Sequence, residues 1–148
     1  GHHVIASGRR ADELARLAAD ARGKAGRLDT VALDVTAPDS IAAAVRAVEQ
    51  LTGERGLDVL INNAGFGVLG PTSEIADAEM RRNYETNVFG LMNVIRAVLP
   101  AMRARRAAAV SATSATANIT TSSSQSCTFA VSRRPLNSSI SSSSSSRK

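Results

Sequence analysis

The sequence is poor in the residues on which several classes of protein function depend. Cys127 is its only cysteine among 148 residues, so no disulfide forms within the chain, which fits a reducing cytoplasm. Aromatic residues make up 3% of the chain and tryptophan is absent, which disfavours nucleic-acid binding by base stacking. No apolar run has the length of a transmembrane helix, and no signal peptide is recognisable. We therefore predict a cytoplasmic protein without a membrane or nucleic-acid partner.

Acidic residues are also absent from the last part of the chain. All 13 of them lie at or before Glu85, whereas Arg133, Arg134, Arg147 and Lys148 lie near the end. From residue 107 onward serine, threonine and alanine dominate, and we expect residues 107–148 to be a disordered low-complexity tail with at most one weak strand, in AAAVSATSA. A basic Ser/Arg tail that recruits RNA is a further hypothesis, which salt-dependent RNA binding tests. Only residues 1–106 have the pattern of a packed domain.

Within residues 1–106, short apolar runs alternate with segments of helical periodicity. The pattern predicts strands at residues 4–7, 28–35 and 57–61, and helices at 11–21, 38–51 and 77–105. The last helix should be broken near Tyr84 and bent at Pro100, and its second half stacks Val88, Leu91, Met92, Ile95, Val98 and Leu99. Strands that alternate with helices indicate an α/β fold with right-handed crossovers around a parallel sheet.

Polar and small residues follow each predicted strand, at the sheet edge where parallel α/β folds bind ligands. Asn62, Asn63, Ala64 and Gly65 follow the third strand, where small residues let a dinucleotide lie against the backbone. Asp34 and Val35 end the second, and a carboxylate there can accept a hydrogen bond from an adenine amino group while valine packs on the ring. Gly8, Arg9 and Arg10 follow the first. A structural turn without a ligand is the alternative for residues 62–65.

Together these motifs resemble the short-chain dehydrogenase/reductase family. The resemblance rests on LDVLINNAG at residues 57–65, on Asp34-Val35 before it, and on Asn87 in ETNVFGLMNVIRAVLPAMR after it, and it covers roughly residues 1–106. It implies that Asp34 and Val35 hold the adenine, that Asn63, Ala64 and Gly65 line the cofactor, and that Asn87 is the helix Asn of the catalytic tetrad. The alternative for Asn87 is a solvated helix residue.

The cofactor predicted from this arrangement is NADP(H) rather than NAD(H). A guanidinium after the first strand pairs with the 2′-phosphate of NADP, whereas a carboxylate there would bind the ribose hydroxyls of NAD. Arg9 and Arg10 stand at that point, and ordinary solvated surface charges are the alternative for one or both. The resemblance further implies a small-molecule alcohol or carbonyl substrate and a homo-oligomer formed through helix 85–105.

Two other patterns carry less weight. Residues 65–70 spell G-x-G-x-x-G after a strand, but Pro71 follows where a helix should open, so we do not interpret them as a dinucleotide fingerprint. His2 and His3 should be plain loop residues, and because no Cys, Asp or Glu lies near them at ligand spacing, we predict no metal.

The proton-transfer residues of the resembled family are missing. Its Tyr is followed four residues later by Lys, but Tyr84 is the only tyrosine, Val88 stands four residues on, and the only lysines are Lys24 and Lys148. Nothing around Ser111 or Ser114 matches the family's serine. The glycine-rich pyrophosphate loop and its strand would lie before Gly1, and that strand would be the middle one of the sheet.

The predicted fold is therefore a partial Rossmann-type doubly wound parallel sheet that lacks the first and the C-terminal strands. We expect unpaired strand edges and poor folding of the isolated chain. Because the family pattern stops after MRARR, we hypothesise a shifted reading frame or a misjoined exon, which translation of the flanking DNA tests. The predicted function is that of a fragment, inactive as it stands, of an NADP(H)-dependent alcohol or carbonyl oxidoreductase. The alternative is a non-catalytic nucleotide-binding or protein-interaction module.

Overall fold

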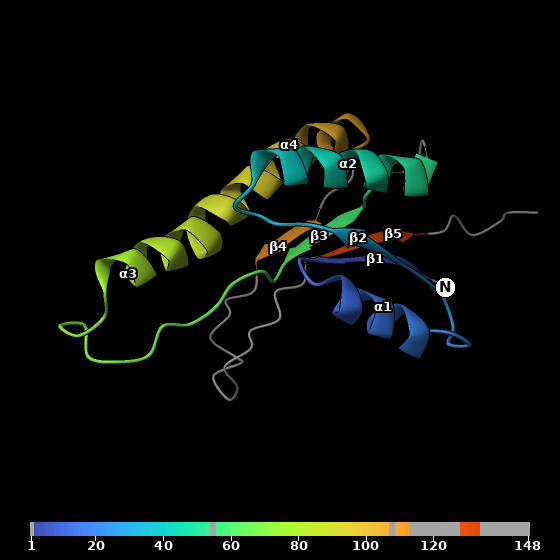
Figure 1. Ribbon diagram of the computed structural model, residues 1–148. Helices are drawn as coiled ribbons and strands as arrows, with labels where there is room; N and C mark the ends of the chain where they lie inside the picture. Colours follow the sequence, from blue (N-terminus) through green and yellow to red (C-terminus); the bar gives the residue numbers. More distant parts are fainter. Residues whose placement is uncertain (1, 54–55, 107–108, 113–127, 134–148) are drawn as a thin grey trace, which may run out of the picture.

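A five-stranded sheet forms the centre of the structure. A computed structural model describes residues 2–53, 56–106, 109–112 and 128–133 (Figure 1). The strand order is β2-β1-β5-β3-β4. β1 (His2–Gly8) pairs in parallel with β2 (Arg27–Ala32), and β3 (Val59–Asn62) pairs in parallel with β4 (Ala109–Ala112). β5 (Thr128–Arg133) lies between β1 and β3 and runs antiparallel to both.

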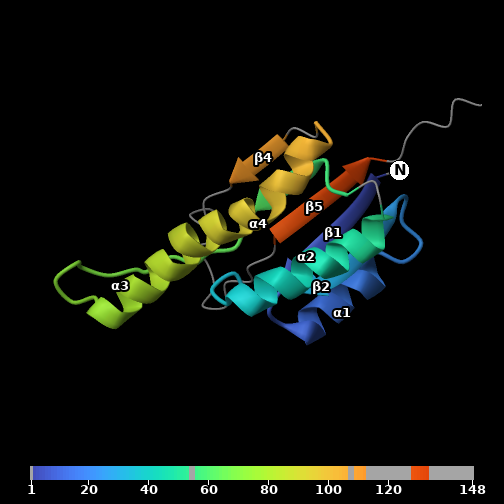
Figure 2. The ribbon, with the colours of Figure 1, turned by 90° about the horizontal axis from the view of Figure 1, so that it is seen from above.

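Helices cover both faces of this sheet. α2 (Pro38–Thr52) and α4 (Leu91–Ala104) lie side by side on one face, and α1 (Ala11–Asp20) lies on the other (Figures 1 and 2). Pro38 begins α2, where its missing N–H costs no hydrogen bond. The core lies between the sheet and the layer of α2 and α4, and its most buried side chains include Ile5, Leu60, Val94 and Met102. These alternating elements confirm the predicted α/β class.

The predicted long helix is one continuous helical segment with a change of pitch. α3 (Asp77–Tyr84) passes into a π-helical turn, η2 (Glu85–Gly90), and then into α4, with helical backbone angles at both junctions. The predicted break near Tyr84 is thus a π-turn and not an interruption. The helix also continues past Pro100 to Ala104. None of the described helices is long and apolar enough to cross a lipid bilayer.

The predicted apolar face of this helix is partly wrong. Val88 and Met92 are 42% and 41% exposed, whereas Val94 and Met102 are buried. α3 and the adjoining end of η2 project beyond the sheet (Figure 1), so that part of the apolar stripe has no sheet to pack against. A π-turn also adds a residue to the helical repeat, which shifts the face that later residues present.

The inward edges of β1 and β3 are paired, contrary to the expectation that they would remain open. β5 supplies the missing partner: its Ala130 stands opposite Ile5 on one side and Leu60 on the other. The position expected for an absent parallel strand is therefore filled by an antiparallel one from beyond residue 106. The weak strand predicted in AAAVSATSA corresponds to β4. The disorder predicted for residues 128–133 is wrong, because they form β5 between two open strand edges; residues 107–108, 113–127 and 134–148 of the predicted tail lie outside the described residues.

His2 and His3 belong to β1, so the prediction that they are loop residues is wrong. His3 Nε2 lies 2.6 Å from Asp29 Oδ2 on β2, and Arg27 Nε lies 2.7 Å from the same oxygen. This contact ties the first two strands together at their amino ends. The described residues contain no group of three or more potential metal-ligating side chains. Residues 65–70 lead into no helix, since α3 begins only at Asp77, which confirms that they are not a dinucleotide fingerprint.

Candidate functional site

A pocket lies at the carboxyl end of the sheet and gathers residues from separate parts of the sequence. Arg9 follows β1, Asp34 and Val35 come shortly after β2, and Ala64 follows β3. Because β1, β2 and β3 all end at this edge, residues far apart in the chain converge here. The described lining consists of Ser7, Arg9, Leu33, Asp34, Val35, Ala64 and Thr86.

Asp34 supplies an ionised acceptor to this pocket. The Thr36 hydroxyl donates to Asp34 Oδ1 at 2.7 Å, and the Thr36 backbone N–H donates to the same oxygen at 2.9 Å. These hydrogen bonds, first the hydroxyl and then the N–H, lower the pKa of Asp34 below 3.8; burial opposes them and the nearby Arg9 adds to them. Thr36 uses only Oδ1, so Oδ2 is left out of this pair of bonds. In addition, the Asp34 N–H donates to Ser40 Oγ at 2.9 Å, which fixes the backbone that carries the carboxylate.

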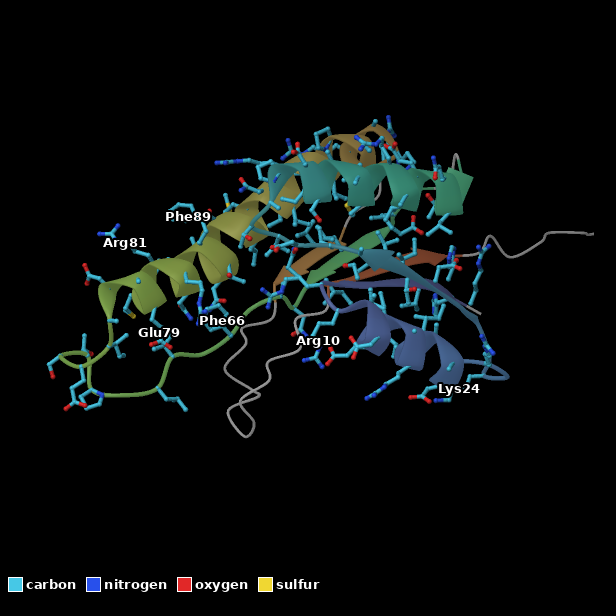
Figure 3. All side chains as sticks on the ribbon, in the orientation of Figure 1. Arg10, Lys24, Phe66, Glu79, Arg81 and Phe89 are labelled. Atoms are coloured by element: carbon cyan, nitrogen blue, oxygen red, sulfur yellow. The ribbon has the colours of Figure 1, made fainter. Side chains whose placement is uncertain are left out.

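The two arginines after β1 have different surroundings. Arg9 lines the pocket, and its charge contributes to the low pKa of Asp34. Arg10 precedes α1 and forms an ion pair with Glu13, in the first turn of that helix. In Figure 3 the Arg10 side chain lies at the start of α1. Arg10 is not part of the described lining, so the structure separates a pair that the sequence treats as equivalent.

The turn after β3 contributes less to the pocket than the sequence predicts. Ala64 lines it, whereas Asn63 and Gly65 are absent from the described lining. Gly65 is buried and Asn63 is half-buried. Asn62 is only 3% exposed. Among the described residues, no hydrogen-bond partner is found for its side-chain Nδ2.

Asn87 fastens the loop that follows this turn. Its Oδ1 accepts from the Phe66 N–H at 3.0 Å, and its Nδ2 donates to the Phe66 carbonyl at 2.9 Å. Asn83 Nδ2 donates to the same carbonyl at 2.6 Å, and the Arg82 guanidinium lies 5.2 Å from the centre of the Phe66 ring. Figure 3 shows Phe66 beside the helix that carries these groups. The side chain of Asn87 is therefore hydrogen-bonded to the backbone of the loop after β3 and is not simply solvated.

A family model described as short chain dehydrogenase matches residues 1–132. The chain belongs to the short-chain dehydrogenase family. The match continues past Arg106, so the predicted end of the family pattern at that residue was too early.

Known members of the family share both sequence and fold with this chain. Human retinol dehydrogenase 8 is 38% identical over 106 residues, which cover 71% of this chain and 32% of that protein. L-sorbose reductase from Gluconobacter frateurii, in complex with NADPH and L-sorbose, superimposes with a TM-score of 0.62 at 33% identity, covering 70% of this chain and 39% of that one. For a variant of actinorhodin polyketide ketoreductase with NADPH, the TM-score is 0.68 at 31% identity, with coverage of 73% and 41%. The chain thus spans about a third of the length of its curated relatives.

The π-helical turn η2 contributes to the pocket in a way that the sequence did not predict. Thr86 is buried and lines the pocket. Gly90 packs against Val35, so closely that a Cβ atom at Gly90 would lie 2.7 Å from Val35 Cγ2. The available signal was a glycine inside a helical pattern, which often marks a close packing contact.

The proton-transfer residues of a short-chain dehydrogenase are not assembled in the described part of the chain. Tyr84 is 54% exposed on the projecting helix, where its neighbours in a surface hollow include Met80 and Phe89. Lys24 lies beyond the far end of α1 from Arg10 (Figure 3). Ser111 belongs to β4, and Ser114 lies outside the described residues. Hence no described tyrosine and lysine form a catalytic pair.

The side chains that line the pocket have a chemistry suited to the adenosine half of a nicotinamide cofactor. An ionised carboxylate, an apolar valine and a guanidinium suit an adenine, its ring face and a ribose phosphate. A pyrophosphate needs backbone N–H groups at the end of a strand, usually at a helix N-terminus. In the described structure, the strand at the central position is β5, which begins at this edge, with Thr128 opposite Ser7, instead of ending there. The cavity in the core beneath α2 and α4 is largely apolar and contains none of the predicted site residues.

Proposed function

We propose that this chain is part of an NADP(H)-dependent oxidoreductase of alcohol or carbonyl groups, and that it binds the adenosine half of the cofactor. The observation that carries the proposal is the convergence of Arg9, Asp34 and Val35 in one pocket. Asp34 accepts from the adenine amino group, Val35 packs on the ring, and Arg9 pairs with the 2′-phosphate. The NADPH complexes of L-sorbose reductase and the polyketide ketoreductase support this cofactor class.

We further propose that the chain alone binds nucleotide without turnover. NADPH supplies a hydride, but reduction of a carbonyl also needs a group that delivers a proton to the oxygen. No such group stands beside the pocket among its described lining residues. In the parent oxidoreductase, Asn87 would act as a positioning residue, because its side-chain amide is bonded to the Phe66 backbone.

The test compares adenosine with adenosine 2′-monophosphate by calorimetric titration. We expect the phosphorylated ligand to bind more tightly, because a charged hydrogen bond contributes about 1.5–3 kcal/mol. The substitution Arg9→Gln should remove that advantage, about 10- to 100-fold in Kd, and leave adenosine binding unchanged. Arg10→Gln is the matched control, since its partner is Glu13. Equal affinity for both ligands, or a loss in the Arg10 variant alone, contradicts the assignment.

Turnover is measured separately from binding. With NADPH and a carbonyl compound, we expect saturable quenching or enhancement of NADPH fluorescence without loss of its absorbance at the wavelength of the reduced ring. Oxidation of NADPH by the purified chain would show that it catalyses hydride transfer. Absence of any binding would indicate a chain without a working nucleotide site.

A protein-interaction role is a second candidate, supported by one surface. The helix formed by α3, η2 and α4 exposes four large apolar side chains, with exposures between 41% and 54%: Tyr84, Val88, Phe89 and Met92. Figure 3 shows Phe89 and Arg81 on the side of this helix away from Phe66. We propose that this surface pairs with a second copy of the chain through helix 85–105.

A further inference from the structure

We propose that Gly90 sets the width of the adenine pocket, by letting the π-turn η2 rest directly on Val35. This inference rests on the proposed nucleotide site and adds a positioning residue to it. Gly90 does not line the pocket itself. It acts through Val35, whose side chain does.

The backbone at Gly90 does not require glycine. Its φ of −58° and ψ of −47° are ordinary helical values, which any residue adopts. Glycine destabilises a helix interior relative to alanine, because it loses more backbone freedom on folding. Because the backbone angles do not require glycine at residue 90, a lack of space for a side chain explains it.

Val35 leaves no room for a larger residue. A Cβ atom at Gly90 would lie 2.7 Å from Val35 Cγ2, 3.1 Å from Val35 Cβ and 3.0 Å from the Val35 carbonyl oxygen. Two of these atoms belong to a short branched side chain that is itself buried, and the third is backbone. Relief of the overlap requires Val35 or the helix to move, because the interior is closely packed.

The other contacts of η2 determine whether Val35 or the helix moves. Asn87 bonds both the N–H and the carbonyl of Phe66, and the buried Thr86 lines the pocket beside Val35. These contacts hold the turn to the loop after β3, so an added methyl group at residue 90 displaces Val35 toward the adenine position. A π-turn has three functions here: it lines the pocket, anchors a loop and supports the valine. Such turns are often found at functional sites.

A double-mutant cycle tests this coupling. Kd for adenosine 2′-monophosphate is measured for wild type, Gly90→Ala, Val35→Ala and the double variant. We expect Gly90→Ala to weaken binding roughly 3- to 30-fold, the range typical of coupled contacting residues. In the double variant the Val35 methyl groups are gone, so Gly90→Ala should cost little further affinity. Gly67→Ala is the matched control, because a Cβ atom there meets nothing within 4 Å.

Thermal unfolding separates a positioning role from a purely structural one. In the Val35→Ala background, Gly90→Ala should lower Tm less than it does in wild type, because the 2.7 Å contact with Cγ2 is gone whereas the contacts with the Cβ and the carbonyl oxygen of residue 35 remain. If Gly90→Ala weakens binding to the same extent with and without the Val35 side chain, or leaves wild-type binding unchanged, the proposal is wrong.

Failure of the proposed function gives a different result. If wild type binds no adenosine 2′-monophosphate, the nucleotide site is refuted, and the coupling is then judged without ligand. The amide NMR resonances of residues 35 and 36 should shift between wild type and Gly90→Ala, differ much less between Val35→Ala and the double variant, and stay in place in Gly67→Ala. Unchanged resonances in Gly90→Ala overturn the steric coupling itself.

Discussion

Thr36 and Asp34 show how single residues prepare the pocket. Both the hydroxyl and the backbone N–H of Thr36 donate to one carboxylate oxygen of Asp34, and the pKa of that carboxyl is lowered as a result. A group whose pKa is lower in the folded than in the unfolded chain stabilises the fold above its unfolded pKa. That contribution is lost as the pH falls through the lowered folded pKa, below 3.8.

The substitution Thr36→Val tests this coupling. It removes the hydroxyl donor, which is the largest cause of the shift, and retains the backbone N–H. We expect the pKa of Asp34 to rise toward 3.8 and the free energy of unfolding to fall at neutral pH, with no effect below the lowered pKa. Carboxyl NMR titration measures the pKa, and urea unfolding at neutral pH and at a pH below the lowered pKa measures the free energy of unfolding. Thr36→Ser retains the hydroxyl and should behave as wild type; an unchanged pKa in Thr36→Val would contradict the assigned cause.

The sequence could predict the residues that follow strands, but not those that reach the pocket from elsewhere. Arg9, Asp34, Val35 and Ala64 are next to predicted strand ends, and the topology of a parallel sheet brings them together. Thr86 belongs to a helix far along the chain, and no local pattern shows which side of that helix meets the sheet. The difference between Arg9 and Arg10 likewise depends on where α1 begins, because Glu13 is within reach of Arg10 only from the helix.

At the scale of elements, amphipathic periodicity predicted α1 and α2 well and the last helix less well. Both shorter helices have a single apolar face against the sheet, with Leu14 buried in α1 and Ile41 in α2. The long helix projects beyond the sheet and changes pitch in η2, so a single regular repeat describes neither its exposed nor its buried side chains. Core packing therefore does not explain the exposed apolar residues near Tyr84.

Pairing with a second copy would account for these exposed residues. We expect the wild-type chain to sediment as a dimer and the variant Val88→Glu/Met92→Glu to sediment as a monomer, because charges on a buried apolar surface oppose association. Ala43→Glu, an exposed position on α2, is the control for added charge. Sedimentation velocity over a range of concentrations makes the comparison. A wild-type chain that is monomeric throughout would refute the pairing.

At the scale of the whole molecule, β5 joins two parallel strand pairs into one sheet. Without it, β1 and β3 would each have an open edge in the interior, which is costly because backbone groups there lack partners. TFAVSR contains the β-favouring residues Phe129 and Val131, but so short an apolar run does not predict which strands it pairs with. The pairing is decided by the two edges that are available to it, Ile5 and Leu60 each standing opposite Ala130. Tertiary context of this kind lies beyond local pattern and propensity.

Disruption of β5 should therefore destabilise the whole sheet and not β5 alone. Proline at residue 130 cannot donate to either neighbouring strand, and a buried acceptor left without its partner in a central strand costs roughly 1–3 kcal/mol. That is a large share of the 5–15 kcal/mol of a typical domain. We expect Ala130→Pro to abolish a cooperative urea transition and the protection of the Ile5 and Leu60 amides from hydrogen exchange. Ser141→Pro, near the end of the chain, is the control. If both variants unfold with the same cooperative transition as wild type, the sheet does not depend on β5, and the parallel pairs are held together by α2 and α4 alone.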